Sequence, residues 1–343
     1  MKVKTLGLVV LACLLIGLFF AWKPLKAIYL SGVPAKLQRN ILYVPTNASF
    51  EQVLDSLVQG GFINDVPGFE WLAERMKYKR PVMRPGRYEI TPGWHNRQLI
   101  QHLRAGKQAP VNVVLNNERL PEEIAGRVAR FLETDSVALA QTFNDPAVLA
   151  QIGYTPQTLL SLFIPNTYQM FWNTGARDFL QRMVKEHDAF WDKNNRREKA
   201  RALGMSAEQV YTLASIVERE TNDAAEKPTI AGVYLNRLKI NMPLQADPTC
   251  VFATRDFSAR RVTEYHTTFD SPYNTYLYKG LPPGPISMAS ISSIDAVLNA
   301  PQHHYLYFCA KPGDSGAHAF AATYAAHLVN ARRFQSWLEQ QGL

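Results

Sequence analysis

The most pronounced feature of the hydropathy pattern lies at the start of the chain. Residues 6–22 form an uninterrupted uncharged run with lysines on both sides. At ~1.5 Å per residue a helix of this length reaches roughly 26 Å, close to the ~30 Å hydrocarbon core of a bilayer. A cleaved secretory signal is the alternative, but Phe20 and Trp22 stand where its cleavage site would need small residues. We therefore expect an uncleaved single-pass anchor, preceded by a short cytoplasmic stub, within residues 1–26.

Changes of hydrophobic period after this run predict a small module of strands and helices. Ile41–Val44 is typical of a strand, and Ser49 with Gln52 forms a capping box before an apolar stripe at helical spacing. A second helical stretch, a strand at Arg87–Ile90 and a short helix follow. This order resembles a LysM-like glycan-binding module, which we expect, together with a linker, at residues 27–108. A spacer that lifts the rest of the chain off the membrane is an equally good interpretation.

Beyond this module the pattern continues as a mixture of short strands and helices. We expect a strand at Val111–Leu115 and a helix at 122–131 within a connecting region, residues 109–154. Aromatic residues and polar turn motifs then become frequent, and we interpret residues 155–343 as a catalytic domain that ends in a helix at 322–340. The expected fold class is therefore α+β.

Composition limits the classes of partner. The chain has 343 residues, of which 47% are hydrophobic, enough for more than one buried core. Its 37 Lys and Arg against 29 Asp and Glu give a formal net charge of +8, which suits a membrane surface, a carboxylate-bearing wall polymer or nucleic acid. The sequence has no stripe of basic residues interleaved with aromatics and no zinc-finger spacing, so we do not expect nucleic acid as a partner.

Neither the cysteines nor the histidines predict a bound metal or cofactor. Cys250 and Cys309 lie in the main body of the chain. They could pair, although buried free thiols are the more common outcome, and the sequence does not decide between the two. His303 and His304 have no third ligand nearby in the sequence. We expect no cofactor and no metal.

A candidate acid stands at the end of an amphipathic helix. Ser206 and Gln209 form a second capping box, and apolar residues follow at helical spacing as far as Val217. Glu218 comes next, at the border of the apolar stripe, where burial would raise its pKa toward neutrality, as a general acid needs. Glu220 is displaced around the helix and is expected to stay solvated. The alternative is that these carboxylates are simply the charged end of a helix.

Three polar turn segments follow this helix, at residues 245–249, 271–276 and 280–286. Their amides, hydroxyls and aromatic faces suit the hydroxyl and N-acetyl groups of sugars, and their prolines limit the entropy lost on binding. Each segment could be a structural turn. Their occurrence together, after a candidate acid, favours a glycan-binding cleft.

The motifs in chain order are Ala214–Thr221, Asn236–Leu238, Leu244–Thr249, Tyr273–Tyr276 and Gly280–Gly284. In composition, order and spacing they resemble the YceG-like (MltG-type) endolytic murein transglycosylases. The likeness runs from about Phe163 to the C-terminal helix, and more weakly over the preceding module and anchor. The chain departs from that family's usual residues just before Leu162–Tyr168 and at Ser287–Ala289, which bears on peripheral contacts and substrate preference rather than on the core around Glu218.

The resemblance implies a lyase that cleaves the bond between N-acetylmuramic acid (MurNAc) and N-acetylglucosamine (GlcNAc) and leaves 1,6-anhydro-MurNAc ends. Glu218 would first protonate the glycosidic oxygen. It would then take the proton of the muramyl C6 hydroxyl as the C6 oxygen attacks C1. The residues that we expect to bind the sugar are Gln245, Asp247, Thr249, Asn274, Tyr276 and His318. Each of them could instead stabilise its own loop, and for His318 a packed, hydrogen-bonded role is the more common outcome.

Two other functions stay open at this point. A muramidase-type hydrolase would use Asp247 as a second carboxylate that activates water. A non-catalytic wall-binding protein would use only the LysM-like module. The expected partners are peptidoglycan strands and the membrane, with wall-synthesis proteins as further candidates. The resemblance implies a place in the bacterial inner membrane, with the catalytic domain on the periplasmic side acting on nascent strands.

Overall fold

The computed structural model describes residues 21–22, 24–30, 32–313 and 316–342. The apolar run that we expected to anchor the chain lies almost wholly outside these residues. Among the described residues, no helix is both long enough and apolar enough to cross a bilayer. The chain divides into two compact units. The first extends to Asn112 and includes residues 131–134 and 169–174, and the second comprises the rest.

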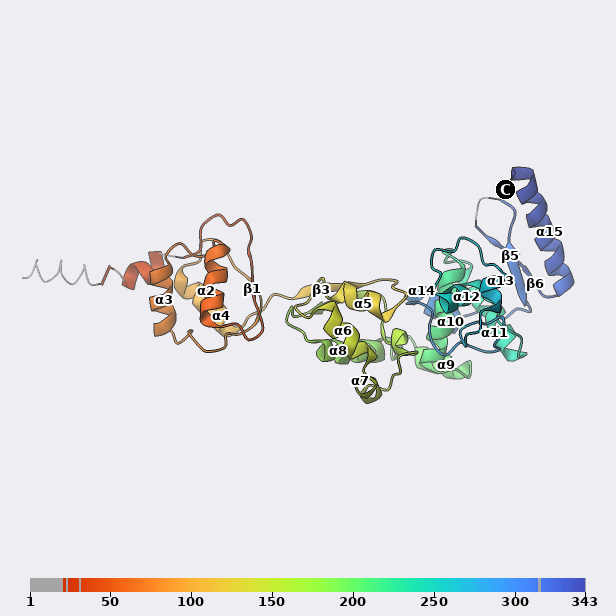
Figure 1. Ribbon diagram of the computed structural model, residues 1–343, viewed down its shortest axis with the longest axis horizontal. Coiled ribbons are helices and arrows are strands. Elements are labelled where there is room, and N and C mark those ends of the chain that lie inside the picture. The colour runs from red at the N-terminus through yellow and green to blue at the C-terminus, as the bar shows by residue number, and fades with distance from the viewer. Residues whose placement is uncertain (1–20, 23, 31, 314–315, 343) are drawn as a thin grey trace, which may run out of the picture. The chain divides into compact units, whose positions relative to one another are not determined.

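The elements of the first unit are η1 (Lys26–Leu30), β1 (Ile41–Val44), α2 (Phe50–Gln59), α3 (Val66–Arg75), β2 (Gly86–Glu89) and α4 (Asn96–Ala105). Figure 1 shows α2, α3 and α4 grouped together in this unit, with β1 to one side of them in this view. The strands are antiparallel, with Leu42 opposite Tyr88, and both side chains are buried. Each helix adds an apolar face to the same core, for example through Val53, Leu72 and Leu99.

The predicted order of strand, two helices, strand and helix is confirmed in this unit. The predicted capping box is present, because the Ser49 hydroxyl accepts from Gln52 N at 3.3 Å and the Gln52 side chain accepts from Ser49 N at 2.8 Å. The second strand begins at Gly86, one residue before the predicted start. Glycan binding by this module stays a prediction.

The remaining elements are β3 (Val111–Leu115), α5 (Pro121–Val128), α6 (Ser136–Asn144), α7 (Pro146–Gln151), η2 (Leu159–Leu162), β4 (Asn166–Met170), α8 (Ala176–Trp191), α9 (Arg196–Ala202), α10 (Ala207–Glu220), α11 (Lys227–Lys239), α12 (Asp247–Thr254), α13 (Glu264–Thr268), α14 (Ile291–Leu298), β5 (Tyr307–Ala310), β6 (His318–Ala321) and α15 (Tyr324–Gln341). In the described residues the strands form two-stranded sheets, β1 with β2, β3 with β4 and β5 with β6. Helices joined to small sheets confirm the α+β class.

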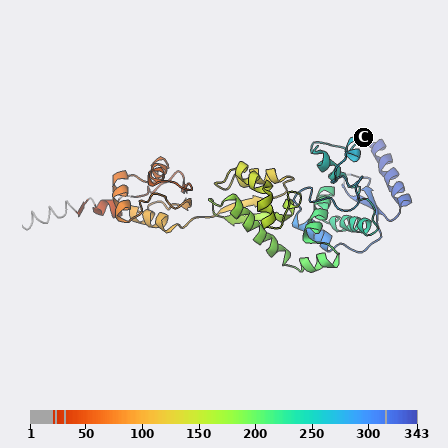
Figure 2. The ribbon, with the colours of Figure 1, turned by 60° about the horizontal axis from the view of Figure 1, so that its bottom comes forward.

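Helix α10 lies at the centre of the second unit. Every residue from Val210 to Val217 is buried, so the helix is covered on all sides rather than along one stripe. It packs against α14 and α11, which Figures 1 and 2 show beside it. Two buried hydroxyls stay within the helix, because Thr212 donates to Glu208 O and Ser215 donates to Thr212 O, each at 2.7 Å. This central helix ends at Glu220 and so carries the candidate acid.

We expect the capping box of α10 to stabilise this unit measurably. Ser206 accepts from Gln209 N at 3.2 Å and the Gln209 side chain accepts from Ser206 N at 2.9 Å. Ser206→Ala should lower the free energy of unfolding by about 1 kcal/mol, measured by urea denaturation of the purified chain. Ser206→Asp, which keeps an N-cap acceptor, should unfold like the parent, and an equal loss in both variants would contradict the capping role.

Candidate functional site

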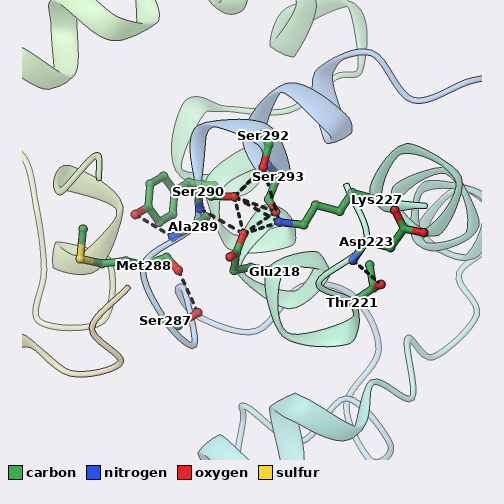
Figure 3. Close-up of polar contacts among 11 residues, drawn as sticks. Glu218, Thr221, Asp223, Lys227, Ser287, Met288, Ala289, Ser290, Ser292 and Ser293 are labelled. Atoms are coloured by element: carbon green, nitrogen blue, oxygen red, sulfur yellow. Dashed lines mark hydrogen bonds and ion pairs between the residues drawn. The ribbon is translucent and has the colours of Figure 1, made fainter. Parts of the chain in front are cut away.

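Glu218 lies in the last turn of α10, and its side chain is 19% exposed. Its Oε2 atom accepts hydrogen bonds from Lys227 Nζ at 2.9 Å and from Ser293 Oγ at 2.6 Å. The backbone N–H of Ser290 also donates to Oε2, at 3.3 Å, and so does the Ser290 hydroxyl. Figure 3 shows these donors converging on the carboxylate. The candidate acid is therefore held by groups from two other helices.

The two oxygens of the Glu218 carboxylate are not equivalent. Among the described residues, all four hydrogen bonds to this group reach Oε2, and Oε1 accepts none. A carboxylate held in this way has a fixed orientation and keeps one oxygen for an incoming group. The arrangement suits proton transfer to and from a ligand at Oε1.

The amino end of α14 faces this carboxylate. Ser290 is the N-cap of α14, and its hydroxyl accepts from Ser293 N at 3.3 Å while donating to Glu218. The unpaired N–H groups at the start of a helix carry a partial positive charge, which favours an anion there. The start of α14 therefore stabilises the ionised form of Glu218.

Lys227 supplies a full positive charge from the start of α11. Its side chain is 7% exposed, and its ammonium group also lies 3.3 Å from Ser290 Oγ and 3.5 Å from Ser292 Oγ. The pair with Glu218 is thus largely withdrawn from water. Removing one member of such a pair leaves an uncompensated charge and typically costs ~3–5 kcal/mol.

These contacts contradict the expectation that the pKa of Glu218 is raised. Burial by itself would raise this pKa, as we predicted. Hydrogen bonds from Ser290 and Ser293, together with the charge of Lys227, outweigh burial and hold the pKa of Glu218 below its ordinary value. The prediction of a raised pKa was wrong because it considered the border of α10 without the donors on α11 and α14.

The segment that precedes α14 is fixed against α10. Ile286 N donates to Ser215 Oγ at 3.0 Å, and Ala289 N donates to the Tyr211 hydroxyl at 3.1 Å. The same Tyr211 hydroxyl donates to Phe163 O at 2.6 Å, so the segments around Phe163 and Ala289 meet at one fully buried side chain. Just before this segment, a Cβ at Gly284 would stand 1.9 Å from Gln157 O, which explains why only glycine fits there.

Glu220 has the opposite environment from the one expected. Instead of standing in solvent it is partly buried, and it accepts a hydrogen bond from the Tyr234 hydroxyl on α11 at 2.5 Å. Burial raises the pKa of Glu220 to about 7, and the hydrogen bond from Tyr234 offsets only part of this effect. The expectation of a solvated Glu220 was wrong because α11 covers the side of α10 on which it lies.

Three of the predicted sugar-binding residues lie at or near the surface in adjoining loops. Gln245 is exposed and has a positive φ of 47°, and its N–H donates to Thr275 O at 3.1 Å. Asp247, at the start of α12, accepts from the Tyr276 hydroxyl at 2.5 Å. Their side chains remain accessible to a ligand, and a sugar-binding role stays a prediction.

Thr249 and Asn274 are fully buried and bind other parts of the protein. The Thr249 hydroxyl lies 2.8 Å from that of Thr275 and donates to Ala246 O at 2.7 Å. The Asn274 amide donates to three backbone carbonyls, the shortest bond being 2.8 Å to Phe269 O. Thr249 and Asn274 therefore have the contacts expected of residues that stabilise their own loops, which was the alternative to sugar binding.

His318 contacts Glu226, which lies next to Lys227 in the chain. Its Nδ1 lies 2.8 Å from Glu226 Oε2, and its N–H donates to Glu226 Oε1 at 2.7 Å. Glu226 immediately precedes Lys227 in the chain and is the N-cap of α11. His318 therefore steadies the start of the helix that carries Lys227, and direct contact with a sugar stays a prediction.

Sequence reasoning missed Lys227, Ser290 and Ser293, the three donors to Glu218. The available signal was local: a serine three residues before another, ahead of an apolar run, is typical of a helix start. Nothing in that pattern shows which distant carboxylate the helix start faces.

Among the described residues no group of three or more His, Cys, Asp and Glu is placed to hold a metal. Cys250 and Cys309 are both free.

Known proteins resemble this chain over most of its length. The model of the YceG-like family matches residues 42–333. An endolytic murein transglycosylase of Bacillus subtilis is 27% identical over 301 residues, covering 83% of this chain and 81% of the relative. A protein of the same name from Streptococcus pneumoniae is 25% identical over 299 residues, with 78% of this chain but only 53% of the relative covered. A crystal structure of a protein described as YceG-like, from Listeria monocytogenes, matches with a TM-score of 0.57 and 27% identity, covering 84% of this chain and 97% of that one.

The raised pKa of Glu220 predicts a pH dependence of stability. The folded chain keeps the Glu220 proton to about pH 7, whereas an unperturbed Glu releases it near 4.5. The folded state therefore binds more protons in this window, and its free energy of unfolding should fall as the pH rises through it, by roughly 2–3 kcal/mol. Glu220→Gln cannot ionise and should lack this fall.

The measurement is urea unfolding of parent and Glu220→Gln from about pH 5 to about pH 8. The variant keeps an acceptor for Tyr234, so its fold should be preserved. Parallel curves for the two proteins would show that Glu220 does not titrate in this window.

Proposed function

The chain belongs to the YceG-like family, and we infer from this membership and from the site that it is an endolytic murein transglycosylase with Glu218 as its acid and base. The relatives named above support the activity. The observation that carries the role of Glu218 is its asymmetric carboxylate, with Oε2 held by Lys227, Ser290 and Ser293 and Oε1 left to the ligand.

The reaction needs one carboxyl group to act twice. Protonated Glu218 gives its proton to the oxygen between MurNAc and GlcNAc, the bond from that oxygen to muramyl C1 breaks, and GlcNAc leaves with a hydroxyl. The acetamido group of the muramyl residue shields the positive charge that develops at C1. The Glu218 carboxylate then takes the proton of the muramyl C6 hydroxyl, and the C6 oxygen bonds to C1. The products are a 1,6-anhydro end and a regenerated Glu218 acid, with no water consumed.

The lowered pKa of Glu218 fits a group that must act as a base in the second step. Without substrate the donors keep the carboxylate ionised near neutral pH. A glycan seated over Oε1 excludes water, and desolvation favours the protonated form. Proton uptake is therefore coupled to binding, and Lys227 and the serines restabilise the carboxylate once the proton has left.

The hydrolase alternative has less support from the geometry. It requires a second carboxylate that activates water opposite Glu218. Asp247, the candidate for that role, accepts a hydrogen bond from Tyr276 and acts electrostatically on Glu220. The groups that contact Glu218 are a lysine and two serines. A purely wall-binding protein would have no need of a carboxylate oriented in this way.

The finer parts of the function are proposals that rest on the sequence. The apolar run at residues 6–22 would hold the chain in the inner membrane, and the remainder would act in the periplasm on nascent strands. The first unit would bind glycan as a LysM-like module. The net charge of +8 suits both the membrane surface and a carboxylate-bearing wall polymer. Wall-synthesis proteins are the proposed protein partners.

The activity itself is tested by the products. Purified parent protein should release from peptidoglycan fragments that end in anhydro-MurNAc, each one water lighter than a reducing end, as measured by mass spectrometry. Glu218→Gln keeps the size of the side chain but cannot transfer the proton, so it should release none. Reducing ends from the parent would instead establish hydrolysis, and undiminished cleavage by the variant would remove Glu218 from the mechanism.

The serines around Glu218 should set the pH range of the activity. Ser293→Ala removes a 2.6 Å hydrogen bond that lowers the pKa of Glu218. The pKa should rise, Glu218 should stay protonated to higher pH, and the alkaline fall of kcat/KM should move upward. Ser292→Ala is the matched control, because the Ser292 hydroxyl contacts Lys227 and Ser290 instead. An unshifted profile in Ser293→Ala would contradict the assignment.

A further inference from the structure

We propose that an arginine-lined pocket beside the Glu218 site binds a carboxylate of the peptide branch that murein strands carry on their muramyl residues. The inference rests on the proposed function, since it names a further part of the same substrate. The pocket has a volume of about 480 Å³. The arginines that line it are Arg119, Arg127, Arg130 and Arg219.

The pocket has an excess of positive charge that the protein does not use. Two glutamates also line it, which leaves a formal excess of two positive charges against the four arginines. Glu118 is buried and paired with Arg127. The Glu123 carboxylate accepts from the backbone N–H groups of Arg119 and Leu120, at 2.7 Å and 3.3 Å. Both acidic groups are therefore engaged within the protein.

Several arginine donors have no partner within the described part of the chain. Arg219 donates through Nη2 to Asn117 O at 3.0 Å, but its buried Nε has no partner. Arg119 lies over the Phe257 ring, 4.9 Å from the centroid. The exposed guanidinium of Arg130 makes no hydrogen bond or ion pair with the rest of the described chain. The guanidinium fork matches a carboxylate, to which it can donate two parallel hydrogen bonds.

The pocket adjoins the site of cleavage without being part of it. Arg219 directly follows Glu218 on α10, and successive helical residues point about 100° apart. Glu118 O accepts from Met288 N at 2.8 Å, so the pocket wall is tied to the segment that ends in Ser290. A ligand group here would lie to one side of a glycan seated over Glu218. A branch of the substrate meets that requirement, and its free carboxylates supply the matching charge.

Gly126 on α5 offers a way to fill the pocket without removing a charge. It lines the pocket, and a Cβ added there would meet no atom within 4 Å. Gly126→Gln therefore adds a neutral side chain at a helical position that favours it. Arg130→Gln removes an exposed charge that holds nothing else in place. Arg177→Gln, on the exposed part of α8 in the same unit, is the matched control.

The experiment compares strands that carry peptides with strands from which an amidase has removed them. On peptide-bearing strands, Gly126→Gln and Arg130→Gln should raise KM by roughly tenfold with kcat unchanged, while Arg177→Gln behaves as the parent. On peptide-free strands, all three variants should match the parent. Equal KM values on peptide-bearing strands, or an equal loss on both substrates, would overturn the proposal.

Two further measurements distinguish failure of this proposal from failure of the proposed function, and a carboxylate ligand from a phosphate ligand. Binding of a soluble muramyl peptide to Glu218→Gln, measured by calorimetry, reports on the pocket without cleavage and should weaken when Gly126→Gln is added. Absence of that binding would overturn the pocket, whereas absence of anhydro products from the parent would overturn the proposed function alone. A phosphate of a lipid-linked strand shares the anionic chemistry. If the variants lose affinity only for peptide-free, lipid-linked strands, the pocket takes phosphate and the carboxylate assignment fails.

Discussion

The ion pair between Glu218 and Lys227 brings together the ends of three helices. Glu218 lies in the last turn of α10, Lys227 begins α11, and Ser290 is the N-cap of α14, so one carboxylate oxygen receives donors from separate segments of the chain. An uncompensated charge in this half-buried position would be costly. The packing of α10, α11 and α14 in the second unit and the orientation of the Glu218 carboxylate are thus two results of the same contacts.

What the sequence predicts well is local. The capping boxes at Ser49 and Ser206 fix where α2 and α10 begin, because an N-cap and its partner three residues later act within a single turn. The order of strands and helices in the first unit is predicted for a similar reason, because the hydrophobic period of each segment is a local property of its sequence. The proposed role of Glu218 rests on a run of motifs in fixed order, since its position on one helix would not distinguish it from a charged helix end.

What the sequence does not predict depends on contacts across the fold. Lys227 lies 9 residues from Glu218 and Ser293 lies 75, and no local rule relates them. The expected rise in the pKa of Glu218 and the expected solvation of Glu220 were both wrong for this reason. Glu218 gains donors that a helical wheel does not show, and Glu220 is covered by α11. Thr249 and Asn274 show that a polar residue in a turn motif can be entirely occupied in holding the loop.

The long separation between Glu218 and its serines also bears on how the enzyme is made. Synthesis runs from the N-terminus, so Glu218 leaves the ribosome well before Ser290 and Ser293. Until those residues arrive, α14 does not exist, and the carboxylate lacks the groups that fix its orientation and its charge. A truncated chain that stops short of α14 would therefore keep Glu218 but lack the contacts from Ser290 and Ser293 that orient it.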